Sequence, residues 1–475
     1  MSAPELHWRP ALELAAMIRD KRVSPVEVVE AALSRIERVN PALNCFGAIT
    51  AEEARDAAMA AEVAVMTGES VGPLHGVPVS IKDLVFTRRV STTGGSRLFA
   101  DHVPEEDAVC VERLKGAGAI ILGKTTTPEF GHKGVTESPL FGITRNPWNP
   151  QRTPGGSSGG AAAAVAAGLG PLAVGTDGGG SIRVPASFCG IYGLKPSFGR
   201  VPQAPGFPGW ETLSHTGPMT RTVRDAALML DVIAGPDDRD RHSLPAAGRS
   251  FLAACEEDIA GLSVAWSPDL GYARVEPEVA ELCATAAERF ESFGGHVEVV
   301  APYWEDPEET FRVMAAAETW GAWGDRLEVD GEKMDRSLRA LLKFGATVTA
   351  AQYLKAQRRR HELWTEVQRF LARFDLLLTP TVAVAPFAVG RPGLNEVNGQ
   401  PSSPLGWMPF CFPFNLTGQP AATVPVGFTS AGLPVGLQIV GRRHADHTVL
   451  AASAAFEAAQ PWADRRPSVE EPRSA

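Results

Sequence analysis

Cysteine is scarce in this chain of 475 residues, and its six cysteines are widely scattered. No Cys-x-x-Cys pair occurs, and the spacing is typical of buried or free thiols in a reducing compartment rather than of a disulfide framework. No cluster of His, Cys, Asp or Glu has the spacing of a metal site either. We therefore expect no disulfide, no metal and no cofactor.

Runs of basic residues are equally rare. The longest is the arginine triplet at 358–360, and the formal net charge of the chain is −10. A protein that binds the nucleic-acid backbone needs a basic face to meet the phosphates. The composition therefore argues against a nucleic-acid partner.

A long hydrophobic run is missing as well. The first ten residues include Glu5, His7 and Arg9, which is not typical of a secretory signal. The uncharged window at 153–176 is interrupted by glycine and proline and has few large apolar side chains to face lipid. These features predict a cytoplasmic protein without a membrane partner.

The chain does contain alternating helical and strand-like sequence. A capping box at 24–27, with proline at the first helical position, predicts a helix that ends near 40–41. A second, alanine-rich helix should run from 51 to about 68. Farther on, apolar runs at 77–81 and 119–122 flank a helical stretch. This spacing is typical of a β-α-β unit and predicts an α/β fold with a partly parallel sheet.

Strand-like sequence returns late in the chain, at 376–384, 421–426 and 433–440. Because sheet-like sequence lies on both sides of a mostly helical region, we favour one interrupted domain over several independent ones. The predicted organisation is a single domain at 1–460. Its parts are N-terminal helices at 1–70, a core at 71–235, a mostly helical excursion at 236–374, and a return to the sheet with a final helix at 375–460. The tail at 461–475 is expected to be disordered.

Two clusters rich in glycine and serine stand out, at 155–160 and 176–181. Successive glycines let the backbone approach a ligand closely and turn several N–H groups toward one point. A helix is expected after each cluster, and its N-terminus would add partial positive charge. Such a place could hold a phosphate or an oxyanion.

A phosphate site is the weaker of these two alternatives, because neither cluster matches the nucleotide-binding patterns GxxxxGK or GxGxxG. An oxyanion site needs a nucleophile and a base beside the N–H groups. Ser181 directly follows three glycines, and Lys82 ends an apolar run, where burial would favour an uncharged amine that can act as a base. In an extended strand Ser80 and Lys82 share one face, and Asp83 points away.

These motifs resemble the amidase signature family. The family pattern combines a strand ending in Ile-Lys-Asp, a Gly-Gly-Ser-Ser-Gly-Gly segment and a Thr-Asp-x-Gly-Gly-Ser segment, which are matched here at 80–83, 155–160 and 176–181. Further matching stretches reach Gly418 and Gly432, so the resemblance covers almost the whole chain. It implies an amidase-signature fold, in which a central mixed β-sheet is surrounded by helices, with a helical excursion.

The resemblance also implies a Ser-Ser-Lys triad. Ser181 would be the nucleophile, Ser157 the bridging serine after a cis peptide bond, and Lys82 the base. The oxyanion would be held by the backbone N–H groups of Gly178, Gly179, Gly180 and Ser181.

Supporting roles are expected for two neighbours of the triad. Ser158 would cap the following helix and hydrogen-bond to Lys82, and Asp177 would fix the glycine loop. One departure from the family pattern is Gly178, where threonine or another side chain often stands. The missing side chain is expected to widen the cleft.

The implied activity is hydrolysis of the carbon–nitrogen bond of amides through an acyl-enzyme that water then releases. The same triad would serve for carbamates (urethanes) or aryl esters. The family also makes a homodimer reasonable, and one of its members is a component of the tRNA-dependent amidotransferase, which works within a complex. A fourth alternative is an esterase in which 156–160 is a GxSxG motif and Ser158 the nucleophile, although 148–154 is loop sequence where that fold expects a strand.

Aromatic residues outside the signature motifs are candidates for the substrate pocket. They predict an apolar or aryl group on the acyl or amine side of the substrate, although ordinary core packing would explain them equally well. The residues singled out as substrate-binding are Phe130, Trp210 and Phe410. The wider set comprises Phe130, His132, 207–210, Trp320, Trp323 and 407–412.

Overall fold

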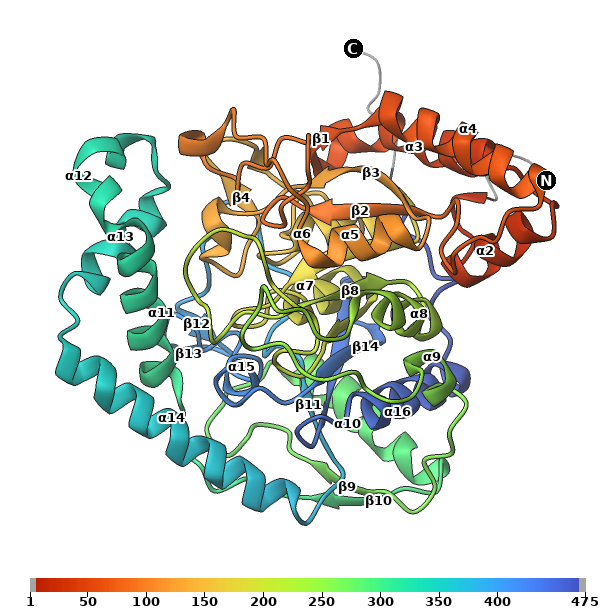
Figure 1. Ribbon diagram of the computed structural model, residues 1–475. Coiled ribbons are helices and arrows are strands. Elements are labelled where there is room, and N and C mark those ends of the chain that lie inside the picture. The colour runs from red at the N-terminus through yellow and green to blue at the C-terminus, as the bar shows by residue number, and fades with distance from the viewer. Residues whose placement is uncertain (1–5, 470–475) are drawn as a thin grey trace.

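A computed structural model describes residues 6–469, and an eleven-stranded sheet runs through it (Figure 1). In sheet order the strands are β1 (Phe46–Ile49), β3 (Ile120–Thr125), β2 (Pro78–Lys82), β6 (Leu172–Thr176), β8 (Thr216–Thr220), β7 (Tyr192–Lys195), β14 (Ala421–Phe428), β15 (Pro434–Gly441), β11 (Leu376–Pro380), β9 (Ser263–Trp266) and β10 (His296–Val299). β2 pairs in parallel with β3 and β6, whereas β8, β7 and β14 continue the sheet in antiparallel pairs. The predicted α/β fold with a central mixed sheet is confirmed.

Helices and short elements surround this sheet. The α-helices are α2 (Ala11–Arg19), α3 (Pro25–Leu43), α4 (Ala51–Thr67), α5 (Val109–Gly116), α6 (Gly159–Ala166), α7 (Arg183–Cys189), α8 (Val223–Ile233), α9 (Phe251–Ala254), α10 (Pro277–Ser292), α11 (Glu308–Trp323), α12 (Leu327–Asp330), α13 (Arg336–Gly345), α14 (Ala350–Leu371), α15 (Pro413–Thr417) and α16 (Asp446–Ala459). The short elements are η1 (Arg97–Phe99), η2 (Glu129–Gly131), η3 (Gly324–Arg326), η4 (Gly331–Lys333), β4 (Glu137–Ser138), β5 (Gly142–Ile143), β12 (Glu396–Val397) and β13 (Gln400–Pro401).

Both faces of the sheet are covered, as β6 shows. Leu172 and Val174 belong to a large apolar cluster that includes residues of α5 and α8, whereas Ala173 packs among residues of α6 and α7. Successive side chains of a strand point to opposite faces, so the two clusters lie on opposite sides of the sheet. The apolar run of β2 is buried for the same reason.

The early helices follow the sequence closely. Ser24 forms the expected capping box with Glu27, and α3 starts at the next residue, Pro25. α3 runs past its predicted end through Pro41 and stops at Asn44, which adopts a left-handed conformation. A proline this near the C-terminus removes only one helical hydrogen bond, so the last turn survives.

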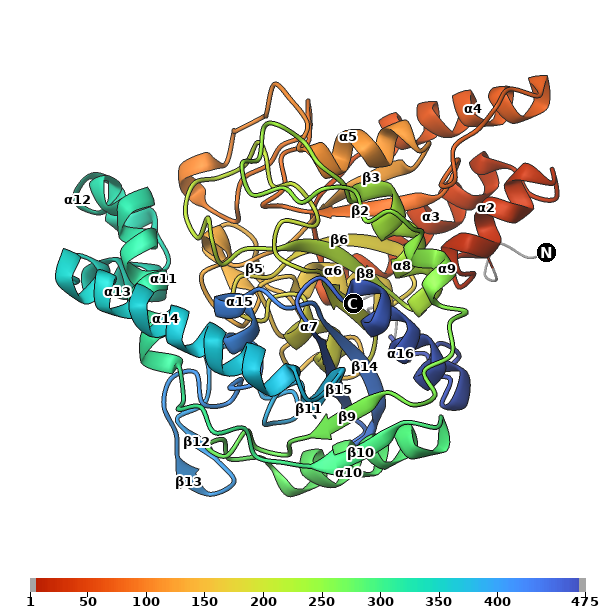
Figure 2. The same cartoon turned by 60° about the horizontal axis from the view of Figure 1, so that its bottom comes forward.

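Helices α11 to α14, residues 308–371, form a separate group on one side of the sheet, which we call the helical arm (Figure 2). The predicted helical excursion at 236–374 contains this arm, but it is not purely helical. Its strands β9 and β10 extend the main sheet in parallel with β11. The excursion therefore returns to the sheet before the arm begins.

The chain end was expected to be a disordered tail at 461–475, but part of it is packed on the protein. Trp462 is buried, and its indole N–H donates a hydrogen bond to the carbonyl of Arg221 at 2.8 Å. Arg465 lies over the ring of Phe428. A buried indole and a cation over a ring hold 461–469 in place, and 470–475 lie outside the described residues.

Candidate active site

Lys82 is the last residue of β2, and its nitrogen lies in the protein interior. The side chain is fully buried, because β2 is a strand flanked by β3 and β6. Burial lowers the pKa of Lys82 well below its ordinary value, and the charge of Asp177 opposes this only in part. Asp83 instead accepts hydrogen bonds from Thr93, as expected if it points away from Lys82.

Three hydroxyl groups surround the Lys82 nitrogen. Nζ lies 2.7 Å from Oγ of Ser157, 2.9 Å from Oγ of Ser158 and 2.9 Å from Oγ1 of Thr176. Ser157 follows a cis peptide bond from Gly156, as the resemblance implies. The fold thus brings the predicted base and the predicted bridging serine together.

Ser158 occupies the N-cap position of α6, but its side chain caps no helical N–H group. The predicted capping role is therefore wrong, because the hydroxyl is committed elsewhere. Oγ donates to the carbonyl of Thr176 at 3.0 Å and contacts Lys82. Ser158 is also fully buried, which leaves no route for a substrate to reach it and removes the basis for a GxSxG esterase.

Ser181 ends the glycine loop that follows β6. It keeps 8% of its surface exposed, against 2% for Ser157, and both residues line the same cavity. The carbonyl of Ser181 accepts a hydrogen bond from the N–H of Ser158 at 3.1 Å. This bond ties the two serine-bearing segments together.

A buried ion pair anchors the glycine loop. Arg183 donates to both carboxylate oxygens of Asp177 at 2.9 Å, and Asn415 donates to the same carboxylate. Burial alone would raise the pKa of Asp177, but the Arg183 guanidinium holds it well below its usual range. Asp177 also accepts from the N–H groups of Gly180 and Ile182, so it shapes the loop.

This arrangement changes the predicted set of oxyanion donors. Gly180 was expected to belong to the set, but its N–H donates to Asp177 at 2.7 Å. The carboxylate that orders the loop therefore takes this donor away. The N–H groups of Gly178, Gly179 and Ser181 have no acceptor among residues 6–469 and stay available to a ligand.

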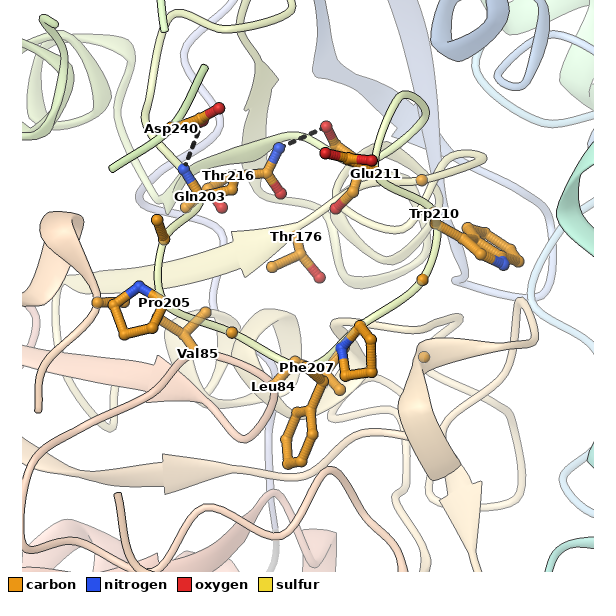
Figure 3. A pocket seen from close by; sticks show the side chains of 18 of the residues that line it. Leu84, Val85, Thr176, Gln203, Pro205, Phe207, Trp210, Glu211, Thr216 and Asp240 are labelled. Carbon is orange, nitrogen blue, oxygen red and sulfur yellow. Dashed lines mark hydrogen bonds between the residues drawn. The ribbon is translucent and has the colours of Figure 1, made fainter. Parts of the chain in front are cut away.

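A cavity of about 580 Å³ opens beside Ser157 and Ser181. Gln203 and Asp240 lie together on one side of it, joined by a hydrogen bond, and Phe207 and Trp210 lie away from them (Figure 3). The cavity thus has a polar side and an aromatic side.

The described residues around this cavity form no metal centre. In the described part of the chain, no group of three or more His, Cys, Asp or Glu side chains is placed to hold a metal ion.

Two of the three aromatic residues predicted to bind substrate line this cavity, namely Phe130 and Trp210. Phe410 does not. It is fully buried in the core, and its carbonyl accepts a hydrogen bond from Gln438 at 2.9 Å. A ring without exposed surface cannot contact a ligand, so Phe410 is a core residue.

The helical arm supplies part of the aromatic wall. Phe130 stacks on Trp323 of α11 with ring centroids 3.9 Å apart, and Phe207 lies against both rings. Trp320, one α-helical turn earlier, is 37% exposed and does not line the cavity. Only one of the two arm tryptophans considered from the sequence therefore faces the site.

The sequence did not reveal how the arm is fastened to the cavity wall. Glu129 accepts a hydrogen bond from the backbone N–H of Asp335 at 2.6 Å, and His132 lies 2.7 Å from Oγ of Ser337. Burial lowers the pKa of His132 to about 4, so its imidazole is neutral near pH 7. The partners are 206 and 205 residues apart, and no local pattern signals such contacts.

Gly178 does not widen the cavity, contrary to expectation. A Cβ atom added there would lie 2.4 Å from Cε3 of Trp210, so the indole already occupies the space that a side chain would take. The neighbouring Gly179 is likewise packed against Phe311.

Known proteins resemble this chain along its whole length. The family model described as Amidase matches residues 27–450. An acylamidase of Rhodococcus erythropolis is 41% identical over 98% of this chain and 99% of its own length. The A component of the glutamyl-tRNA(Gln) amidotransferase of Moorella thermoacetica is 37% identical, again over 98% of this chain and 99% of its own.

Solved structures agree with these sequence relatives. A bacterial aryl acylamidase of the amidase signature family superposes with a TM-score of 0.91, at 36% identity, over 96% of this chain and 97% of that one. The 6-aminohexanoate cyclic dimer hydrolase gives a TM-score of 0.89 at 31% identity, over 98% and 99%. The chain belongs to the amidase family, in the group of amidase signature enzymes.

Proposed function

We propose that the protein hydrolyses amides with an apolar or aryl group by forming an acyl-enzyme on Ser181. Cleavage of amide carbon–nitrogen bonds follows from membership of the amidase family, whereas the roles of the catalytic residues and the substrate class are inferred. The observation that carries the proposal is the 2.7 Å contact between Nζ of Lys82 and Oγ of Ser157, beside the cavity that Ser181 lines.

The donors and acceptors around Lys82 support a role as base. The hydroxyl hydrogen of Ser158 is directed to the carbonyl of Thr176, so Ser158 accepts a hydrogen from Lys82. Oγ1 of Thr176 can accept a second one. A neutral amine has two hydrogens, so its lone pair is left to face Ser157.

Protons then pass from Ser181 to Ser157 and from Ser157 to Lys82. Ser157 gives its hydroxyl proton to Lys82 and takes the proton of Ser181, whose oxygen attacks the carbonyl carbon. The N–H groups of Gly178, Gly179 and Ser181 stabilise the oxyanion, and loss of one such donor typically costs about 3 kcal/mol. Lys82 returns the proton through Ser157 to the leaving amine, because an amide does not expel an unprotonated amine. Water attacks the acyl ester by the same relay and regenerates Ser181.

The aromatic side of the cavity supports an apolar or aryl substrate. The relatives point in the same direction, since they include an acylamidase and an aryl acylamidase. Carbamates and aryl esters are a second candidate class, because attack on their carbonyl carbon needs the same nucleophile, relay and N–H donors.

A panel of anilides, primary amides, aryl esters and aryl carbamates, assayed with the purified protein, tests the substrate class. We expect kcat/KM to be about tenfold or more higher for anilides than for matched primary amides, because an apolar ring gains contact energy in the aromatic wall. Equal kcat/KM values across apolar and polar leaving groups would refute the apolar class. A higher kcat/KM for aryl carbamates than for anilides would make carbamates the principal substrate class.

The amidotransferase relatives suggest a different possibility, namely a chain that is active only within a complex. Gel filtration of the purified chain, with each fraction assayed on an anilide, distinguishes an enzyme that is active alone from one that is active only within a complex. We expect activity to elute with the chain alone. Activity that appears only after a partner protein is added would favour the role within a complex.

A further inference from the structure

We propose that Trp210 limits the size of the substrate group beside the oxyanion loop, in place of the side chain that residue 178 lacks. This inference rests on the proposed function and deepens it. The group concerned is a planar or branched apolar group, on either the acyl or the amine side of the scissile bond.

The first observation is the fit between Gly178 and Trp210. A Cβ atom on Gly178 would lie 2.4 Å from Cε3 and 2.9 Å from Cζ3 of the indole, and the backbone of Gly178 is not in the left-handed region. No conformational requirement therefore demands glycine at this position. The glycine is needed because the indole fills the space next to the loop.

The second observation is that the indole is held firmly. Its Nε1–H donates to Oγ1 of Thr319 at 2.8 Å, and that hydroxyl donates to the carbonyl of Ala315, one turn earlier in α11. The ring also meets Phe311 edge-on, with centroids 5.8 Å apart. Trp210 itself has φ of +56°, a conformation that costs energy in a non-glycine residue.

The third observation is position. Trp210 and Gly178 both line the cavity that contains Ser181, and Gly178 supplies one of the free N–H groups. A rigid apolar surface at this point contacts whatever group extends from the carbonyl toward α11. Replacing the indole by a small side chain enlarges the cavity at that point and leaves the relay of Lys82 and Ser157 untouched.

The experiment compares Trp210→Ala and Trp210→Phe with the parent protein on two substrate series. One series keeps aniline as the amine and enlarges the acyl group from acetyl to butyryl and benzoyl. The other keeps acetyl and enlarges the amine from aniline to 2-naphthylamine. The readout is the ratio of kcat/KM for the largest to that for the smallest member of a series.

We expect Trp210→Ala to raise this ratio by about tenfold or more in one series, with Trp210→Phe in between, because each methylene-sized clash relieved in a pocket changes discrimination by about 10- to 200-fold. The series that responds identifies the side of the substrate that meets the indole. A loss of general stability would lower kcat/KM for all members alike and leave the ratio unchanged.

Gly178→Ala provides an independent test. The added methyl group collides with the indole, so kcat/KM should fall for every substrate, and Trp210→Ala in the same protein should restore part of the loss. Trp320→Ala is the matched control, since it removes an indole of α11, the helix that holds Trp210, at a position outside the cavity, and it should leave the ratio unchanged.

Ratios that stay unchanged in both series for folded Trp210 variants would overturn the inference, as would a purely additive Gly178→Ala/Trp210→Ala double variant. Failure of the proposed function is distinguishable, because the parent protein would then fail to hydrolyse anilides through Lys82.

Discussion

The nitrogen of Lys82 lies 2.7 Å from the hydroxyl oxygen of Ser157, which follows a cis peptide bond. The amine is fully buried, and the carboxylate that raises its pKa, that of Asp177, is paired with Arg183. The ion pair thereby orders the glycine loop and weakens the pull of Asp177 on the Lys82 proton. The expected effects of substitutions at Lys82, Ser157 and Ser158, and the expected pH dependence, follow from this arrangement.

Lys82→Met should lower kcat on an anilide by about 10⁴-fold while the protein stays folded, because removal of one member of a nucleophile–base unit has an effect of that size. Lys124→Met is the matched control. Lys124 is also fully buried, but its nitrogen contacts Thr87, Thr92 and the carbonyl of Val85 and none of Lys82, Ser157 and Ser181. We expect this variant to lower the melting temperature and to keep kcat within about tenfold. Retention of activity in Lys82→Met, together with its loss in a histidine variant, would contradict the proposed base.

The pH dependence follows from the lowered pKa of Lys82. In the proposed mechanism the neutral amine is the active form, so kcat/KM should rise with pH through the folded-state pKa of Lys82 and be lost as the pH falls below it. His132 also lines the cavity, but burial lowers its pKa to about 4. A pH profile of His132→Asn checks the assignment, and displacement of the acid limb in this variant would point to the imidazole instead.

The two serine hydroxyls next to Lys82 should differ in their importance for catalysis. Ser157→Ala removes the bridging hydroxyl of the proposed relay and should reduce kcat by about 10³-fold or more, whereas Ser158→Ala removes a supporting contact and should lower kcat by about tenfold. Mass spectrometry after rapid quenching of an aryl ester reaction should show an acyl adduct on the parent protein and none on Ser181→Ala. An adduct that persists in Ser181→Ala would assign the nucleophile elsewhere.

Arg183→Met should destabilise the protein strongly. The guanidinium and the Asp177 carboxylate are fully buried, and removal of one partner leaves the other charge without compensation. Losses of this kind are about 3–5 kcal/mol in the free energy of unfolding, measured by denaturant titration. The exposed pair of Arg239 and Glu112 offers a comparison, and Arg239→Met should change the free energy by about 1 kcal/mol or less. Equal effects of the two substitutions would contradict this account.

The fastening of the arm can be tested at Glu129. Its carboxylate is buried, and it accepts from the backbone N–H of Asp335 and from Ser96. Glu129→Ala should leave the Asp335 N–H unpaired, cost about 1–3 kcal/mol and raise KM more than it lowers kcat, because Phe130 beside it loses its fixed position. Glu129→Gln keeps an acceptor and should restore most of the loss. An altered kcat with an unchanged KM in Glu129→Ala would indicate that Glu129 takes part in the reaction instead of holding the cavity wall.

Local signals in the sequence predicted the signature region well. The apolar run before Lys82 indicated a buried strand, and the glycines before Ser181 indicated a loop with free N–H groups. Both depend on residues close together in the chain, where spacing determines which side chains share a face. The α/β class and the parallel arrangement of β2 and β3 could be predicted for the same reason.

The features that could not be predicted from the sequence depend on packing between segments that are far apart in the chain. Phe410 and Trp323 are both aromatic residues outside the motifs, but one fills the core and the other stacks on Phe130 at the cavity. Both residues are hydrophobic, so hydrophobicity in the sequence does not distinguish the core residue from the cavity residue. The misjudged effect of Gly178 has the same origin, because the residue that takes its space, Trp210, belongs to a different segment.

Part of the cavity wall comes from a later stretch of the chain than the residues of the proposed relay. Lys82, Ser157 and Ser181 lie early, whereas Trp323 and Thr319 belong to the helical arm. We expect substitutions at such arm positions to change which substrates are accepted more than they change the proposed reaction, except where the arm packs against the glycine loop, as Phe311 does at Gly179. For the proposed function, the arm thus offers positions at which substrate choice can be altered while Lys82, Ser157 and Ser181 are retained.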